Sequence, residues 1–120
     1  MKKIYIAGPI SADNPIKMFA NIKAGNEAAA LLLFDGFAVF SPFLDFTLLF
    51  TDFGSDITKA ILQGNSMAWV ECCDAMLVLP GWETSGGTQR EMERAKTLGI
   101  PIYFDPEQLV REMSEEEGGK

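Results

Sequence analysis

Short apolar runs alternate with segments of helical period along this chain, and no other feature constrains its fold as much. The apolar runs predict strands at Lys3–Ala7, Phe37–Phe40, Ala75–Leu79 and Ile100–Phe104. Strands rich in Ile, Val and Leu that alternate with amphipathic helices are typical of a parallel sheet covered on both faces. The sequence therefore predicts an α/β fold.

The helices between these strands are placed by their end signals. Asn14 and Pro15 are typical of a helix start, and Gly36 of the stop that follows it. The face of this first helix toward the core is expected to comprise Ile16, Phe19, Ile22, Asn26, Ala30 and Leu33. The other helices are expected from about Ser55 to Val70, from Ser85 to Gly99, and from Pro106 to about Met113. The whole arrangement predicts a flavodoxin- or Rossmann-like three-layer sandwich around a parallel sheet of roughly four or five strands.

Length and composition indicate a single domain. The chain has 120 residues, of which 48% are hydrophobic, enough for one ordinary core. We expect that domain to span residues 1–113 and the charged segment 114–120 to be a disordered acidic tail. No apolar run approaches the ~18 residues of a membrane span, and no leader pattern is present, so we expect a soluble, cytoplasmic protein without a membrane partner.

Charge and residue types exclude several kinds of function. The net charge is -7 and the ten basic residues form no cluster, which argues against a nucleic-acid partner. Histidine is absent, so serine–histidine and cysteine–histidine catalysis are excluded. Cys72 and Cys73 are adjacent, a spacing that suits neither an ordinary disulfide nor the ligand pairs of a zinc site. We expect two reduced thiols and no bound metal.

Two unusual loops are predicted to meet at the carboxyl edge of the sheet, where ligands of such folds bind. They are "AGPIS" after the first strand and "PGWETSGG" after the third. Gly8 alone indicates no more than a tight turn, and the common glycine-rich nucleotide motifs are absent. In the second loop, Ser85 is an expected N-cap, and two glycines open a helix whose positive end favours an anion.

Glu91 follows early in that same helix. By itself such a glutamate indicates a favourable partner for the helix dipole, here also spaced to pair with Arg94. Beside an anion-binding loop and the glycine at the tip of the first strand, it becomes a candidate nucleophile.

The motifs "KKIYIAGPI" and "CDAMLVLPGWETSGGTQREMERAKTLGIPIY", together with the helix before the second one, resemble the nucleoside 2-deoxyribosyltransferase-like family. The resemblance runs from about Lys2 to Phe104. This family includes the deoxyribosyltransferases and the 2'-deoxynucleoside 5'-phosphate N-hydrolases. The likeness extends to small uncharacterised bacterial and phage relatives that carry "YIAGP" and "LPGWE".

The resemblance implies an N-glycosidic bond that is broken or exchanged by double displacement, without a cofactor. Glu91 matches the family's nucleophile. The positions that match its substrate-binding segments are Tyr5, Gly8, Pro9, Ile10, Ser85 and Gly87. Family members that take nucleosides tend to carry Asp at the position of Ser85, whereas nucleotide hydrolases carry Ser. Because a hydroxyl among backbone N–H groups accommodates a phosphate, the resemblance favours a nucleoside 5'-monophosphate as substrate.

Two departures from the family pattern bear on activity. The family's Asp on the helix before the third strand corresponds to Ser66, and serine is no general acid at neutral pH. Asp45 or Asp56 is a possible replacement; otherwise the chain is a non-catalytic nucleotide-binding or sensing protein. The arginine that the phosphate-taking hydrolases carry after the first strand is also missing, since Ser11 follows Ile10. A third reading, a flavodoxin-like structural domain, has no flavin signature to support it.

Aromatic residues suggest two further roles. Trp82 is placed either to stack on a base or to pack against the long loop after the second strand. That loop carries four phenylalanines that are expected to line the roof of the pocket or a subunit contact: Phe43, Phe46, Phe50 and Phe53. With the family resemblance, they lead us to expect a homodimer or larger homo-oligomer.

Overall fold

A four-stranded sheet forms the centre of the molecule. The structure is a computed structural model, and it describes residues 1–10, 12–41, 43, 48 and 51–118. The strands are β1 (Lys3–Ala7), β2 (Ala38–Phe40), β3 (Ala75–Val78) and β4 (Ile102–Tyr103). They lie in the order β2-β1-β3-β4, and all three pairs are parallel. The predicted α/β fold with a parallel sheet is confirmed.

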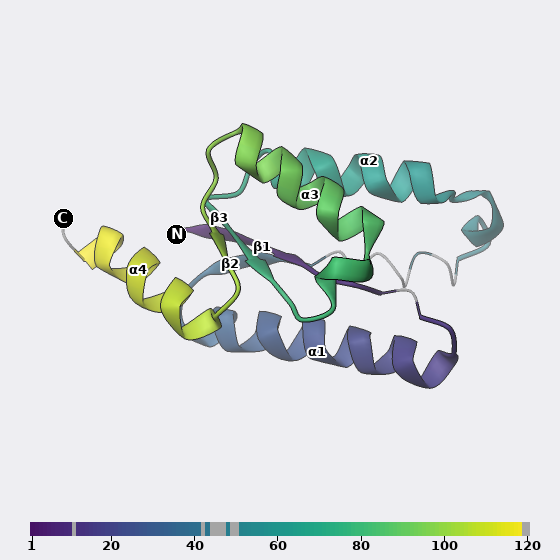
Figure 1. The fold of residues 1–120 in the computed structure, drawn as a ribbon, viewed down its shortest axis with the longest axis horizontal. Helices are drawn as coiled ribbons and strands as arrows, with labels where there is room; N and C mark the ends of the chain where they lie inside the picture. Colours follow the sequence, from purple (N-terminus) through teal and green to yellow (C-terminus); the bar gives the residue numbers. More distant parts are fainter. Residues whose placement is uncertain (11, 42, 44–47, 49–50, 119–120) are drawn as a thin grey trace.

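Helices cover both faces of this sheet (Figure 1). On one face, α1 (Pro15–Phe34) and α4 (Pro106–Gly118) share a core cluster with the sheet, whereas α2 (Lys59–Val70) and α3 (Gly86–Thr97) cover the other face. The strand residues alternate between the two clusters, as the twofold period of a strand requires. In β1, for example, Ile4 and Ile6 belong to the first cluster and Tyr5 and Ala7 to the second.

The chain order reverses beside β1, because β2 lies on one side of it and β3 on the other. The loops that leave the carboxyl ends of β1 and β3 lead to helices on opposite faces of the sheet, α1 and α3, and ligands of such folds commonly bind at this point. This is the place at which the sequence predicts a ligand site.

The first helix begins as predicted, but it presents a different face to the core. The Asn14 side chain accepts a hydrogen bond from the backbone N–H of Lys17 and caps the helix. Gly25 and Leu32 are its buried residues. Of the predicted face, Ile22 packs against the core, whereas the other residues are exposed: Ile16, Phe19, Asn26, Ala30 and Leu33. The helix is rich in Ala and Leu on all sides, so spacing alone could not fix its rotation. In the observed rotation Gly25 faces the buried ring of Phe43, where a larger residue would clash.

Other boundaries also differ from the predictions. A short 3₁₀ turn, η2 (Gly54–Asp56), occupies the predicted start of the second helix, and α2 begins after Thr58, whose hydroxyl accepts from the N–H of Ile61. At the other end of the chain, α4 continues to Gly118 rather than ending near Met113. Glutamate favours helices, and no glycine or proline interrupts the segment before Gly118.

Candidate active site

The loops after β1 and β3 lie against each other, as predicted. A Cβ added at Gly8 would lie 3.0 Å from Leu79 Cβ, and one added at Gly81 would lie 3.1 Å from Pro9 Cγ. Gly81 also has a left-handed backbone with φ 92°, which favours glycine. Gly8 and Gly81 therefore allow the two loops to approach closely at the carboxyl edge of the sheet.

Ser85 begins the helix that follows the second loop. It is the N-cap of α3, and its Oγ accepts a hydrogen bond from the backbone N–H of Thr88 at 3.3 Å. The Ser85 and Thr88 hydroxyls are also 2.8 Å apart, and Thr88 is buried. This cap does not use the N–H groups of Gly86 and Gly87. They lie at the positive end of the helix, where they can donate hydrogen bonds to an anion.

Glu91 lies on α3 at the point where this helix meets β1 and α2. Its side chain is 6% exposed. The Tyr5 hydroxyl donates to Glu91 Oε2 at 2.8 Å, and the Gln63 side-chain amide donates to the same oxygen at 3.5 Å. A carboxylate that burial removes from water needs such donors, so Tyr5 and Gln63 stabilise Glu91 in this position.

Tyr5 and Gln63 therefore have roles that the sequence did not reveal. Tyr5, predicted to line the substrate, is completely buried and reaches Glu91 from within the core. Gln63 was not predicted at all. The feature that could have identified Gln63 is its position in α2, about one helical turn before Ser66, on the side that packs against α3.

Ser66 itself is buried in α2, with Val70 one turn further along the same face. Of the two carboxylates considered as replacements for the missing Asp, Asp45 lies outside the described residues. Asp56 is exposed on η2. Among the described residues, Tyr5 and Gln63 are hydrogen-bonded to Glu91.

Ile10 and Trp82 are packed against the protein. Ile10 packs against the α1 side of the core, and its carbonyl accepts from the Asn21 side chain at 3.3 Å. Trp82, in the short 3₁₀ turn η3 (Trp82–Thr84), is half-buried and contacts Phe104 with ring centroids 5.6 Å apart. Trp82 thus packs on the segment after β4.

The four phenylalanines of the long loop after β2 have different surroundings. Phe43 is a core residue, Phe53 is exposed, and Phe46 and Phe50 lie outside the described residues.

Comparison with models of protein families identifies the family of this chain. The model of a family described as a domain of unknown function (DUF4406) matches residues 2–104. The chain belongs to this family. The matched segment contains both loops, together with β1, α2 and α3. No curated protein matches the chain.

Three solved structures have the same fold as this DUF4406 member. A 2-deoxyribosyltransferase from Bacillus psychrosaccharolyticus is 22% identical with a TM-score of 0.60, and the match covers 83% of this chain and 69% of that one. A conserved protein from Enterococcus faecalis V583 is 19% identical with a TM-score of 0.66, over 85% and 61% of the two chains. A 2-desoxiribosyltransferase from Leishmania mexicana is 24% identical with a TM-score of 0.58, over 85% and 62%. The match therefore covers less than two thirds of the length of the latter two chains. The predicted resemblance is confirmed at the level of the fold.

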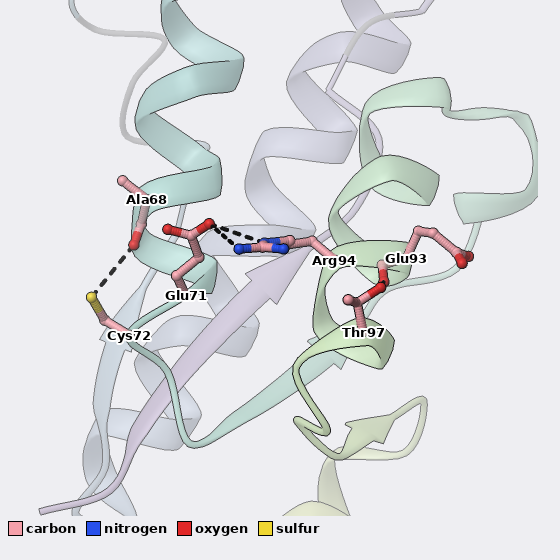
Figure 2. A network of polar contacts seen from close by, with 6 residues as sticks. All are labelled: Ala68, Glu71, Cys72, Glu93, Arg94 and Thr97. Carbon is pink, nitrogen blue, oxygen red and sulfur yellow. Dashed lines mark hydrogen bonds and ion pairs between the residues drawn. The ribbon is translucent and has the colours of Figure 1, made fainter.

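An ion pair joins α2 and α3 in this DUF4406 chain (Figure 2). Glu71, the C-cap residue of α2, accepts from Arg94 Nη2 at 2.8 Å and from Arg94 Nε at 3.0 Å. Arg94 therefore bridges the two helices, instead of pairing within its own helix as its spacing from Glu91 suggested. Because Gln63 and Glu91 lie on the same two helices, this ion pair helps to fix their separation.

The two cysteines lie just beyond the C-terminal end of α2. Cys72 is exposed, and its thiol donates to the carbonyl of Ala68 at 3.4 Å (Figure 2). Burial, together with the negative charge of Asp74, raises the pKa of Cys73 to about 11.

Within the described residues, no group of His, Cys, Asp or Glu could hold a metal ion, and no helix is long and apolar enough to cross a membrane.

Proposed function

We propose that the chain acts on the N-glycosidic bond of a (deoxy)nucleoside 5'-monophosphate, with Glu91 as the nucleophile. It either hydrolyses this bond or transfers the glycosyl group to a second base. The observation that carries this proposal is a buried carboxylate, held by Tyr5 and Gln63, at the carboxyl edge of a parallel sheet. Two structural neighbours are named as 2-deoxyribosyltransferases, which supports glycosyl transfer in general. Carboxylate nucleophiles are the usual solution for acetal-like carbons.

The proposed reaction has two displacements. An oxygen of Glu91 attacks the anomeric carbon and forms a glycosyl ester, while the bond from that carbon to the base nitrogen breaks. The base leaves with the bonding electron pair and takes up a proton. Water, or a second base, then attacks the same carbon, releases the sugar phosphate or a new nucleotide, and returns the carboxylate of Glu91. No redox step or external reductant is required.

The start of α3 supports a 5'-phosphate on the substrate. Ser85 and the N–H groups of Gly86 and Gly87 offer donors at the positive end of a helix. Arg90 adds a cation there, because a Cβ built on Gly86 would lie only 3.4 Å from Arg90 Nη1. The guanidinium of Arg90 thus supplies charge near this loop, although the loop after β1 carries no arginine.

Base release tests this proposal. The purified chain is incubated with each ribo- and deoxyribonucleoside and with each 5'-monophosphate, and free base is measured by chromatography. We expect release from one or more 5'-monophosphates, its loss in Glu91→Gln, and full activity in Glu93→Gln, a control that changes an exposed glutamate on the same helix. Base release that survives Glu91→Gln would show that Glu91 is not the nucleophile.

A non-catalytic nucleotide sensor is the second candidate, because Ser66 stands where the family resemblance places an Asp. A sensor would release no base, yet its melting temperature would rise with a nucleotide, since a ligand that binds only the folded state stabilises it. If base is released, Ser66→Ala tests whether Ser66 takes part in the reaction. An enzyme that uses Glu91, Tyr5 and Gln63 should keep its turnover within about twofold in this variant.

We also propose that the chain is a homo-oligomer. Large apolar side chains of its first helix are exposed to solvent: Ile16, Phe19, Leu31 and Phe34 are 81%, 63%, 62% and 88% exposed. Apolar surface of this kind commonly marks an interface. Light scattering coupled to size exclusion should report a mass above that of one 13.2 kDa chain; a monomeric mass at high protein concentration would contradict it.

A further inference from the structure

Gln63 connects the two helices that flank the candidate nucleophile. It lies on α2, half-buried, and contacts two consecutive residues of α3. Its amide Nε2 donates to Glu91 Oε2 at 3.5 Å, and its Oε1 accepts from Arg90 Nη2 at 3.3 Å. A neutral side chain therefore lies between a buried carboxylate and an exposed guanidinium.

The chemistry of these neighbours determines which way the amide points. A guanidinium only donates hydrogen bonds, so the group of Gln63 nearest Arg90 has to be the oxygen. Once the oxygen faces Arg90, the nitrogen faces Glu91 and presents its N–H to the carboxylate. The opposite orientation would place two donors together and two acceptors together.

Gly87 provides the room for this contact. A Cβ added at Gly87 would lie 3.2 Å from Gln63 Oε1, closer than ordinary van der Waals contact. The glycine at this position lets the side chain of α2 approach the first turn of α3. The glycine of the predicted anion loop thus also makes space for the residue that contacts the nucleophile.

We propose that Gln63 is the positioning residue of Glu91, and that Arg90 holds Gln63 in the orientation that donates. The inference rests on the proposed function, in which Glu91 is the nucleophile. It explains how the site works with Ser66 where the family resemblance places an Asp. An amide positions the carboxylate without adding a second negative charge beside it, whereas a neighbouring carboxylate would repel it. The 3.5 Å distance is long, and such bonds commonly shorten when substrate binds.

The test uses two variants that keep side-chain length, Gln63→Met and Arg90→Met, and the double variant. Their controls make the same changes on α4, at Gln108 and Arg111, and Gln108 also donates to a glutamate, at 2.8 Å. The first measurement is the NMR resonance of the Glu91 carboxyl carbon, assigned by its loss in Glu91→Gln.

We expect Gln63→Met to move this resonance, Arg90→Met to move it in the same direction by a smaller amount, and the double variant to match Gln63→Met. The α4 controls should leave it in place. An unmoved resonance in Gln63→Met overturns the positioning role. An unmoved resonance in Arg90→Met, with Gln63→Met shifted, overturns the role of Arg90. Both results are independent of turnover.

The second measurement is turnover. We expect Gln63→Met to lower kcat about tenfold with KM within about twofold, because one hydrogen bond to a charged group is lost. Arg90→Met should lower kcat less, and should have no further effect on kcat in the Gln63→Met background. Gln63→Glu keeps the acceptor for Arg90 but places a charge beside Glu91, so its loss should exceed that of Gln63→Met. An unchanged kcat in either Gln63 variant overturns the inference.

The two measurements separate the inference from the proposed function. If the unmodified chain releases no base from any substrate, the proposed function fails, while the Glu91 resonance still decides whether Gln63 and Arg90 act on this carboxylate. If base is released and the variants change neither readout, the proposed function stands and the inference fails.

Discussion

Two glycines in helix interiors should respond in opposite ways to the same substitution. Replacing glycine by alanine inside a helix gains about 1 kcal/mol, because glycine loses more backbone entropy on folding. At Gly64 in α2, an added Cβ meets nothing within 4 Å, so the gain should appear in full. At Gly25 in α1, the same Cβ would lie 2.6 Å from Phe43 Cδ2 and 2.7 Å from Cε2.

The clash at Gly25 cannot be relieved cheaply, because Phe43 is 2% exposed and its ring is surrounded by the core. Overpacking of this kind costs about 1–3 kcal/mol, which offsets or exceeds the helix gain. We therefore expect Gly64→Ala to raise the free energy of unfolding by about 1 kcal/mol and Gly25→Ala to lower it by up to about 2 kcal/mol.

Urea denaturation followed by circular dichroism measures both free energies, and thermal melting should agree at roughly 4 °C per kcal/mol for a domain of this size. The comparison between the variants isolates the clash, because both carry the same helix gain. Equal stabilisation by the two alanines would show that Phe43 does not pack on α1 as described. It would also remove the reason given for the rotation of that helix.

Three further predictions concern the site and its support. Tyr5→Phe removes a buried donor to Glu91 and should lower kcat roughly 10- to 100-fold; unchanged turnover would show that this hydroxyl is not needed. Arg94→Met breaks a half-exposed ion pair with Glu71 and should lower the unfolding free energy by about 0.2–1 kcal/mol, an effect that should shrink in roughly 1 M salt. Cys73 has a pKa raised from 9.0 to about 11, so the unfolded state loses the proton first and stability should fall as pH rises between these values. Denaturation at several pH values should show a shallower fall in Cys73→Ala, and identical slopes would contradict it.

The sequence was a good guide to the sheet and to the edge at which the loops meet. Strand β1 was predicted with its observed limits because it is an uninterrupted apolar run, and the helix caps at Asn14 and Ser85 form the bonds that their side chains favour. Adjacency of the two loops followed from the rule that parallel strands end at one edge. These features depend on local chemistry or on topology alone.

Features that depend on contacts between distant segments were not predictable in this way. The rotation of α1 is set by one phenylalanine beyond β2, and helical spacing within an Ala- and Leu-rich segment does not reveal it. The role of Gln63 depends on how α2 packs against α3, which its local sequence does not encode. Arg94 illustrates the same point, because its partner Glu71 is on the neighbouring helix.

Trapping the glycosyl-enzyme would test the central role of Glu91 most directly. A 2'-deoxy-2'-fluoro-arabinonucleoside 5'-monophosphate slows the second displacement, because fluorine destabilises the oxocarbenium-like transition state. After incubation with this compound, intact-protein mass spectrometry should show one added sugar phosphate, and peptide mapping should place it on Glu91. Base release without any adduct, or an adduct on another residue, would contradict the account.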